Sequence, residues 1–278
     1  MPLFSIIEPY SPVKSLLYNS IMRADTLELL CNPYTGEPFK LVDNMLVGVA
    51  SGQSFPIRQG IPVIHDPTHH PWRVRWNRFL YDLYALMYDR IMDWSEILKS
   101  SSEASIRREY IANLPVASGY KILECATGTA SNLLQLPLQG EYYAQDLSWQ
   151  MLVRGQQKLE NAGRSAELFQ GDGAFLPFRN QTFDLVFQMG ALQFYTDPFK
   201  GVSEMARVAK PGAQVHIIDE VRGAIRTLRR LPAHAHHAKG KTIAVKATAV
   251  LVPPSMQEIE TEILPGGDFY ALRFTTPE

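Results

Sequence analysis

The chain has 278 residues, of which 46% are hydrophobic, 10% aromatic and 20% charged. This composition excludes a largely disordered, collagen-like or coiled-coil protein, and the length fits one main fold with a smaller appendage. The 27 basic and 28 acidic residues leave a formal charge of −1, so no chain-wide positive field favours nucleic acid as a partner. Two cysteines, Cys31 and Cys125, are too few for a disulfide framework. Since neither a leader pattern nor an apolar run of about 18 residues stands out, we expect a cytoplasmic protein.

The first part of the chain alternates short apolar runs with Gly, Pro and Asn. Between Leu27 and His65 this pattern predicts a small β module, and the polar stretch Asp66–Pro71 predicts its boundary. From Trp72 to about Leu114 the apolar spacing changes to that of helices, with several aromatic residues on one face. A β module followed by a helical segment is therefore expected.

From Lys121 onward, strand-like runs alternate with helical segments, which indicates a mostly parallel sheet covered on both faces. The predicted strands are Lys121–Glu124, Glu141–Asp146, Ala166–Gln170, Phe183–Met189 and Gln214–Asp219. Helices are predicted to open near Ser131, Ser148, Pro198 and Ala224. The last stretch, Glu258–Thr275, holds two strand-like runs around Pro265–Asp268 and predicts an antiparallel hairpin.

Three loops follow the first three predicted strands, at the edge where open α/β sheets bind ligands. After Glu124, the small-residue turn 125–130 leads into a helix and lets backbone amides approach an anionic group. Asp146 ends the second strand, where a carboxylate can accept hydrogen bonds from ribose hydroxyls. Asp172 follows the third strand, where a carboxylate can accept from an exocyclic amino group.

Each loop also has a simpler interpretation. The first could be a tight strand-to-helix turn that binds nothing. Asp146 or Ser148 could cap the helix that contains Met151, although Ser148 could cap while Asp146 takes the ribose. Asp172 could be an ordinary turn residue. The position of all three loops at one edge favours a ligand site.

Five motifs occur in a characteristic order between Lys121 and Glu220. They are Ile122-Leu123-Glu124-Cys125-Ala126-Thr127-Gly128-Thr129-Ala130, Gln145-Asp146-Leu147-Ser148 with Met151-Leu152, Gly171-Asp172-Gly173 with Leu176-Pro177-Phe178, Phe183-Asp184-Leu185-Val186, and Glu204-Met205-Ala206-Arg207-Val208 with Lys210-Pro211-Gly212. In order and spacing this set resembles the class I S-adenosylmethionine-dependent methyltransferases.

The resemblance implies S-adenosylmethionine as cofactor and no metal. Glu124 and the loop Ala126–Ala130 would hold the methionine end, Asp146 the ribose, and Asp172 with its neighbour the adenine. The implied cofactor-binding residues are Glu124, Ala126, Thr127, Gly128, Asp146, Leu147, Met151, Asp172, Gly173 and Gln188. Alanines at 126 and 130 stand where the family usually has glycine, and an added methyl group either fits with a small shift or crowds the ligand.

The front module has two pairs of positions at the spacing of a four-ligand zinc ribbon. The pairs are Cys31 with Tyr34 and Ser51 with Ser54. The module resembles the zinc ribbons found before certain ribosomal RNA methyltransferases, and the small proteins that partner tRNA methyltransferases. Because three of the four positions are poor zinc ligands, we predict that hydrogen bonds and packing replace the metal.

The helical segment Tyr81–Asp89 is similar to the region before the cofactor fold in ubiquinone and menaquinone C-methyltransferases, where it closes over the cofactor and helps to form the acceptor pocket. Aromatic side chains with polar tips suit such a pocket, and ordinary helix packing explains them equally well. The candidate pocket residues are Tyr84, Tyr88, Gln193 and Tyr195. No motif identifies a catalytic base, for which the candidates are Gln193, Tyr195, Asp219, Glu220 and Tyr88.

The expected fold class is α/β: a Rossmann-like, doubly wound and mostly parallel sheet with a C-terminal antiparallel hairpin, a small N-terminal β module and a helical lid. We predict a zinc-ribbon-like module without its ligands over 1–70 and a methyltransferase domain over 71–278. The latter divides into the lid (71–114), the cofactor-binding core (115–223), and a C-terminal helix and hairpin (224–278).

The leading interpretation is methyl transfer to a small apolar or aromatic acceptor, such as a quinone, a polyketide or another secondary metabolite. One alternative is a non-methylating cyclase or cofactor-binding protein on the same fold, which Ala126 and Ala130 motivate. A second is an RNA methyltransferase, which the front module motivates and the charge of −1 disfavours. The expected partner is the small-molecule acceptor; peripheral membrane contact through a lipid-like acceptor and the oligomeric state stay open.

Overall fold

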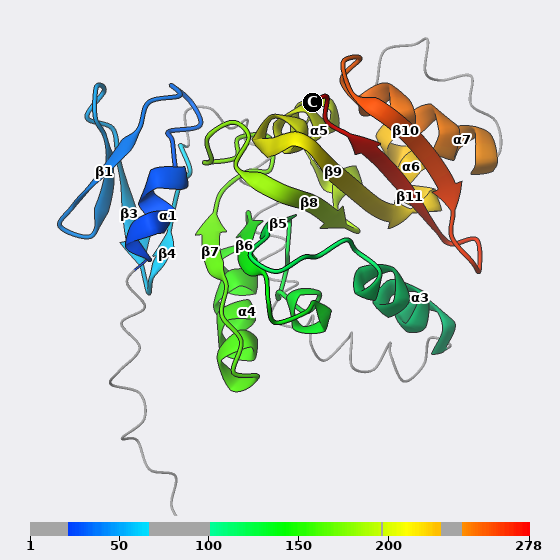
Figure 1. Cartoon of the computed structure of the whole chain (residues 1–278), viewed down its shortest axis with the longest axis horizontal. Helices are drawn as coiled ribbons and strands as arrows, with labels where there is room; N and C mark the ends of the chain where they lie inside the picture. Colours follow the sequence, from blue (N-terminus) through cyan, green and yellow to red (C-terminus); the bar gives the residue numbers. More distant parts are fainter. Residues whose placement is uncertain (1–21, 67–100, 196, 229–240) are drawn as a thin grey trace, which may run out of the picture.

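The structure, a computed structural model, describes residues 22–66, 101–195, 197–228 and 241–278 (Figure 1). The front module is a four-stranded antiparallel sheet in the order β1-β2-β3-β4, preceded by a short helix. Its elements are α1 (Ala24–Leu29), β1 (Phe39–Val42), β2 (Met45–Gly48), β3 (Ser54–Arg58) and β4 (Ile61–Pro62). Asp43 and Asn44 both have positive φ angles, as a two-residue hairpin turn requires. The predicted β module is confirmed.

The main sheet has seven strands in the order β10-β11-β9-β8-β5-β6-β7. Its strands are β5 (Lys121–Cys125), β6 (Glu141–Asp146), β7 (Glu167–Gln170), β8 (Phe183–Met189), β9 (Ala209–Glu220), β10 (Gln257–Ile263) and β11 (Phe269–Thr275). Strands β5 to β9 are parallel, and β11 pairs antiparallel with β9 and with β10. This confirms the Rossmann-like sheet and the terminal hairpin. Strand β9 begins earlier than predicted because an irregular register near Phe183 lets Ala209 join the pairing.

Five helices and three 3₁₀ turns accompany this sheet within the described residues. They are α3 (Ser101–Ala112), α4 (Trp149–Asn161), α5 (Pro198–Val208), α6 (Val221–Leu228), α7 (Lys241–Ala247), η3 (Leu133–Gln135), η4 (Leu192–Phe194) and η6 (Thr248–Leu251). The Ser148 side chain caps α4 by accepting from Met151 N–H at 3.3 Å, and the Asp197 side chain caps α5 by accepting from Lys200 N–H, as N-terminal helix caps commonly do.

The prediction of a helix that begins near Ser131 is wrong, because the structure has only the 3₁₀ turn η3 at this place. Pro137 holds the preceding Leu136 in an extended conformation (φ −76°, ψ 154°), which ends helical geometry after one turn. The predicted helical lid is described only from residue 101, as α3. Tyr84 and Tyr88 lie outside the described residues, as does the predicted boundary near residue 70.

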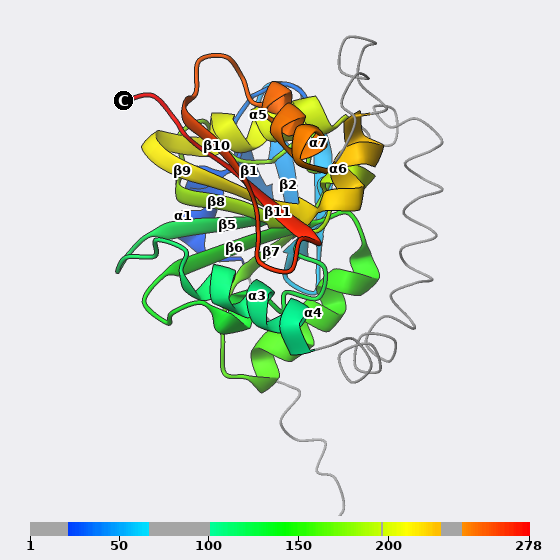
Figure 2. The same ribbon diagram turned by 90° about the vertical axis from the view of Figure 1, so that its right-hand side faces the viewer.

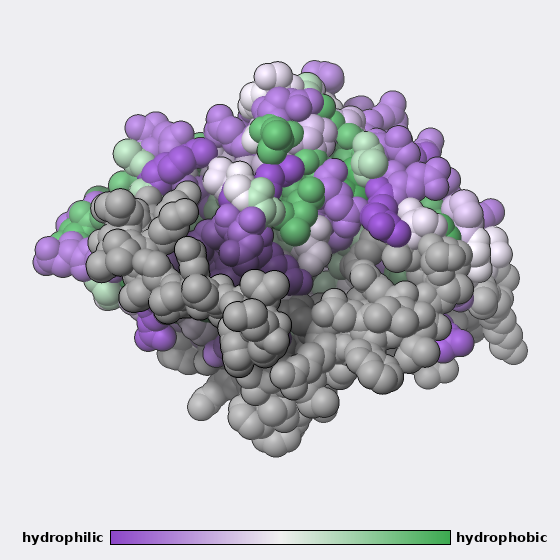
Figure 3. All heavy atoms as spheres, turned by 90° about the horizontal axis from the view of Figure 1, so that it is seen from below, coloured by the Kyte–Doolittle hydropathy of each residue, from purple (hydrophilic) through white to green (hydrophobic). Residues whose placement is uncertain are grey.

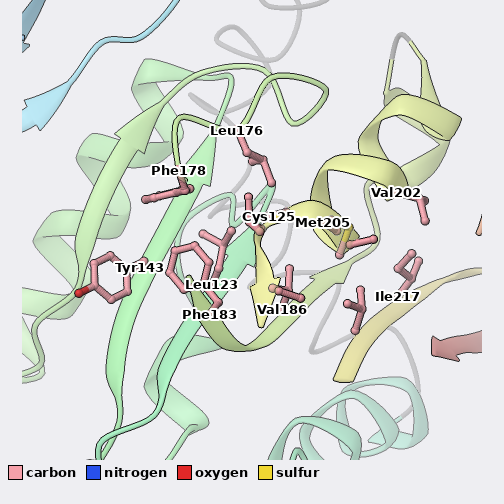
Figure 4. Packing of buried hydrophobic residues seen from close by; sticks show 14 of the residues in the cluster. Leu123, Cys125, Tyr143, Leu176, Phe178, Phe183, Val186, Val202, Met205 and Ile217 are labelled. Carbon is pink, nitrogen blue, oxygen red and sulfur yellow. The ribbon is translucent and has the colours of Figure 1, made fainter. Parts of the chain in front are cut away.

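Alternate residues of the central strands point to opposite faces of the sheet, as the pleat dictates. One face packs against α5, α6 and α7, and the other against α3 and α4 (Figure 2). Strand residues of the first face are Leu123, Val186, Ile217 and Leu272. Those of the second face are Ile122, Leu185, Ile218 and Ala271. Figure 4 shows the first face, where Val202 and Met205 of α5 lie near Val186 and Ile217.

The front module lies against β7, the edge strand of the main sheet (Figure 1). Val63 forms a parallel bridge with Gln170, and Leu30 an antiparallel bridge with Phe178. Buried side chains of the module belong to the same hydrophobic cluster as those of the first sheet face; they are Leu30, Phe39, Leu46, Phe55, Ile57 and Ile64. The module therefore covers an edge that would otherwise expose unpaired backbone groups.

Within the described residues, no helix has the length and apolar character needed to cross a membrane. On the described part of the face in Figure 3, hydrophilic and hydrophobic residues are interspersed.

Candidate functional site

The candidate site lies at the carboxyl edge of the parallel strands, where the loops after β5, β6, β7 and β8 and the end of β9 meet. Strands β6 and β7 follow β5 on one side and β8 and β9 lie on the other, so the chain reverses direction across the sheet at β5. Open α/β sheets bind ligands at such a switch point.

Glu124 ties the first loop to the end of β5. Its side chain is buried, with 1% of its surface exposed. One carboxylate oxygen accepts from Thr127 Oγ1 at 2.6 Å and the other from Asn132 Nδ2 at 2.6 Å. Two charge-assisted hydrogen bonds thus fix both ends of the loop to one buried carboxylate. Sequence reasoning identified Glu124 and Thr127 but missed Asn132, a polar residue eight positions beyond the glutamate.

Ala126, Gly128 and Ala130 alternate in the left-handed region, with φ angles of 54°, 58° and 54°. Alanine adopts this conformation at a cost of about 1–2 kcal/mol, so the two alanines occupy left-handed positions that glycine would adopt without this strain. Gly155 of α4 makes room for Ala130: a Cβ at residue 155 would lie 3.1 Å from the Ala130 methyl carbon. Beside Gly128, a Cβ would meet no atom of the described residues within 4 Å. The described part of the chain therefore does not crowd the loop backbone at Gly128.

Asp146, at the end of β6, links the first two loops. Its Oδ2 accepts from the backbone N–H of Gly128, and its Oδ1 from that of Ser148, both at 2.8 Å. A carboxylate has about four acceptor positions, so a role in tying the loops together does not conflict with the predicted hydrogen bonds to ribose hydroxyls. Leu147 is half-buried and Met151 is buried on the first turn of α4. Both roles considered for Asp146 and Ser148 are therefore compatible.

Asp172 and Gly173 form the third loop, and both are buried. The Asp172 carboxylate accepts from Ala174 N–H at 2.9 Å. Gly173 lies against Tyr195, since a Cβ at residue 173 would be 2.7 Å from the tyrosine hydroxyl oxygen. Tyr195 is 7% exposed, and burial raises the pKa of its hydroxyl well above the usual value. The hydroxyl therefore stays protonated at neutral pH.

Two buried side chains hold the loop after β8. Gln188, when its amide oxygen faces the loop, accepts from Gly190 N–H at 3.1 Å and from Leu192 N–H at 3.2 Å. Asp219, at the end of β9, accepts from Leu192 N–H at 2.8 Å and from Glu220 N–H at 2.7 Å. In this geometry Gln188 shapes the loop that borders the site. Its predicted role in cofactor binding stays a prediction.

The candidates for a catalytic base differ in exposure. Gln193 and Asp219 are buried, whereas Glu220 is exposed. Burial raises the pKa of Asp219 to about 7, although hydrogen bonds from the backbone N–H groups of Glu220 and Leu192 act in the opposite direction. Since both Asp219 oxygens bind backbone N–H groups, this carboxyl group holds the loop. No described side chain is thereby identified as the base.

The Tyr195 ring occupies space that two glycines leave, and this gives a prediction about Gly201 of α5. A Cβ at residue 201 would overlap the ring. Gly→Ala in a helix usually stabilises by about 1 kcal/mol, but here overpacking should make Gly201→Ala less stable by about 1–3 kcal/mol. Urea unfolding measures the change, and Ser203→Ala in the same helix is the control. In a Tyr195→Leu background Gly201→Ala should become neutral or stabilising; a stabilising effect next to the native tyrosine would contradict the packing argument.

In the front module, hydrogen bonds join the two turns that hold Cys31 with Tyr34 and Ser51 with Ser54. Glu37 accepts from Ser51 N–H at 2.8 Å and also from the Ser51 hydroxyl, and Asn32 Nδ2 donates to Gln53 Oε1 at 2.9 Å. The hydrogen bonds that Glu37 itself accepts, chiefly those from Ser51, lower the pKa of its carboxyl group to about 2. In the described ranges, no group of three or more His, Cys, Asp or Glu side chains is arranged to hold a metal ion.

Comparison with known proteins agrees with this geometry. A model of the methyltransferase domain matches residues 123–217. A phosphatidylethanolamine N-methyltransferase of Cereibacter sphaeroides is 33% identical over 167 residues, which is 57% of this chain and 81% of that protein. A demethylmenaquinone methyltransferase of Mycobacterium sp. (strain JLS) is 32% identical over 141 residues, which is 50% of this chain and 57% of that protein. The chain thus spans little more than half the length of this menaquinone relative.

Two solved structures support the fold. A structure described as an S-adenosyl-L-methionine-dependent methyltransferase from Methanococcus maripaludis has a TM-score of 0.52 at 17% identity and covers 68% of this chain and 92% of its own. The CurJ carbon methyltransferase has a TM-score of 0.50 at 14% identity and covers 68% of this chain and 58% of its own.

The sheet order and the loops at its carboxyl edge define the Rossmann-like class of folds, which binds nucleotide cofactors at this edge. Within this class, the methyltransferase model matches residues 123–217, and the chain matches 81% of the C. sphaeroides N-methyltransferase at 33% identity. These two matches identify the family. The chain belongs to the class I S-adenosylmethionine-dependent methyltransferases, and membership implies S-adenosylmethionine as its cofactor.

Proposed function

We propose that the protein transfers a methyl group from S-adenosylmethionine to a small, apolar or aromatic acceptor, with a lipid-like quinone as the leading candidate. The observation that carries the choice of acceptor is the exposure of two phenyl rings in the segment that follows β8. Phe194 of η4 is 44% exposed and Phe199 of α5 is 45% exposed. Exposed aromatic surface at a site of this kind favours an apolar ligand.

Two relatives are named for lipid acceptors. One is a phosphatidylethanolamine N-methyltransferase and the other a demethylmenaquinone methyltransferase. Both acceptors combine an apolar body with a polar head group. The exposed Phe194 and Phe199 would contact the apolar body, and the nearby Gln193 and Tyr195 offer polar atoms at the same loop.

The chain's own contribution is binding and orientation. When bound, S-adenosylmethionine supplies a methyl group on a positively charged sulfur, and its transfer depends chiefly on alignment with the acceptor. We expect the loop 126–130 to hold the methionine end, Asp146 the ribose and Asp172 the adenine. Ala126 and Ala130 fit their left-handed positions, which weakens the case for a fold that has lost its cofactor.

Calorimetric titration tests the cofactor part of the proposal. We expect S-adenosylhomocysteine to bind with a dissociation constant on the order of micromolar, near −8 kcal/mol. Asp146→Ala removes the acceptor for two backbone N–H groups and for the ribose, so it should weaken binding at least about tenfold. Asp268→Ala, which changes an exposed residue of the β10–β11 turn, should bind like the wild type. Absence of binding by the wild type would refute the enzyme assignment.

A transfer assay with a radiolabelled methyl group tests the acceptor. The wild type is offered a short-chain demethylmenaquinone analogue, phosphatidylethanolamine vesicles and total RNA in parallel. The proposal expects label in the organic extract of the quinone reaction, and Asp146→Ala should reduce it. Label found only in RNA would support the alternative acceptor class and contradict this proposal.

A further inference from the structure

The backbone of the front module contacts the end of β7 and the loop that follows it. Val63 bridges Gln170 in parallel, and Ile64 N–H donates to the Gln170 carbonyl at 2.8 Å. The next residue, Gly171, lies so close that a Cβ there would be 3.1 Å from the Ile64 carbonyl oxygen. The module backbone is therefore in contact with the start of the Gly171-Asp172-Gly173 loop.

Tyr34 makes a second contact with this loop. Its ring lies against Phe175, with the ring centroids 5.2 Å apart and the planes at 40°. Its hydroxyl oxygen accepts from Asp66 N–H at 3.0 Å, and the Asp66 carboxylate accepts from Gln53 Nε2 at 2.9 Å. Tyr34 is thus anchored within the module while its ring packs on the main domain.

Phe175 has a second contact, with a charged side chain. The Lys200 ammonium nitrogen of α5 lies 3.3 Å from the centroid of the Phe175 ring, a cation–π contact. The Phe175 N–H donates to the Asp172 carbonyl at 2.8 Å. Phe175 and Asp172 therefore belong to one hydrogen-bonded turn.

We propose that Tyr34 is a positioning residue of the cofactor site: by holding Phe175 it fixes Asp172, so the front module contributes to the protein's preference for adenine. The inference rests on the proposed use of S-adenosylmethionine and assigns to the module a role that its sequence does not show. Tyr34 occupies one of the four positions at zinc-ribbon spacing, and in this structure its ring packs on the cofactor loop.

The electrostatics around Tyr34 agree with this placement. Burial, together with the negative charges of Asp172 and Asp66, raises the pKa of its hydroxyl to about 12, and the hydrogen bond from Asp66 N–H acts in the opposite direction. The hydroxyl is therefore neutral at physiological pH.

Two ligands that differ only in the base separate positioning from general stability. S-adenosylhomocysteine carries the exocyclic amino group that Asp172 is expected to accept from, and S-inosylhomocysteine carries a carbonyl oxygen there. The wild type should prefer the adenine ligand. Tyr34→Leu removes the ring contact and should lower that preference about tenfold, the effect of one misplaced hydrogen bond. Tyr34→Phe keeps the ring and should stay within about threefold of the wild type and restore the preference that leucine loses.

Two further variants complete the test. Phe175→Leu removes the main-domain ring of the Tyr34–Phe175 contact, so it should lower the preference for adenine as Tyr34→Leu does. It also provides the test if the Tyr34→Leu variant fails to fold. Leu46→Val loosens the buried core of the module without touching Phe175, and should leave the preference unchanged. If Tyr34→Leu and Phe175→Leu keep the wild-type ratio of the two dissociation constants, the positioning role is refuted. If the wild type binds neither ligand, the proposed function itself fails.

Discussion

Asp219→Asn should remove a pH dependence of about 4 kcal/mol from the free energy of unfolding. Burial raises the pKa of Asp219 to about 7 from an ordinary value of 3.8. Below about pH 4 the carboxyl group is protonated in both the folded and the unfolded chain. Between pH 4 and 7 the unfolded chain loses this proton while the folded chain keeps it, so the folded state loses stability as the pH rises.

The asparagine variant cannot titrate at this position, and its stability should lack that decline. At acid pH it should be less stable than the wild type by about 1–3 kcal/mol, because the amide cannot accept from both Leu192 N–H and Glu220 N–H. By pH 8 the wild type carries the cost of a buried charge, so the order should reverse.

Urea unfolding from pH 4 to 8 measures both curves, and only their difference is interpreted because other groups titrate in both proteins. Glu220→Gln removes an exposed neighbouring charge and should follow the wild-type curve. Parallel curves for Asp219→Asn and the wild type would show that Asp219 has an ordinary pKa.

The sequence was sufficient to predict the parallel strands of the main sheet, because each contains a short apolar run next to turn residues. Strands β6 and β8 have the predicted bounds. The prediction of a helix at residues 131–137 was wrong. The apolar spacing there is that of a helix, but Pro137 restricts Leu136 to an extended conformation, so the helix does not form. The sequence also could not show that Leu46 and Ile64 of the module share one buried cluster with the main domain, because local periodicity does not report which distant residues meet.

The candidate site was predicted to a similar extent. Motif spacing predicts that Glu124, Asp146 and Asp172 lie at one sheet edge. In the structure, hydrogen bonds join neighbouring loops at this edge, and one example is Gly128 N–H donating to the Asp146 carboxylate. The contribution of Tyr34 depends on a docked orientation of two chain regions more than a hundred residues apart, and no pattern within either region encodes it. The motifs therefore do not show which distant residues contact these loops.

The second large effect is expected at Glu124. Glu124→Ala should lower the free energy of unfolding by about 3–5 kcal/mol, because it leaves the buried Thr127 hydroxyl and Asn132 amide without their acceptor. It also opens a cavity in a fully enclosed site. The loop that carries Gly128 loses both of its side-chain anchors to β5, so the affinity for S-adenosylhomocysteine should fall by more than about tenfold.

Urea unfolding and calorimetry on the same preparations test this expectation, and Glu160→Ala is the matched control because Glu160 is exposed on α4. That control should change the free energy of unfolding by less than about 0.5 kcal/mol and leave ligand affinity intact. Glu124→Gln keeps the side-chain volume and one acceptor oxygen, so it should fall between the wild type and Glu124→Ala in both measurements. If Glu124→Ala lost stability but bound S-adenosylhomocysteine as tightly as the wild type, the carboxylate would be a structural anchor whose loop does not contact the cofactor.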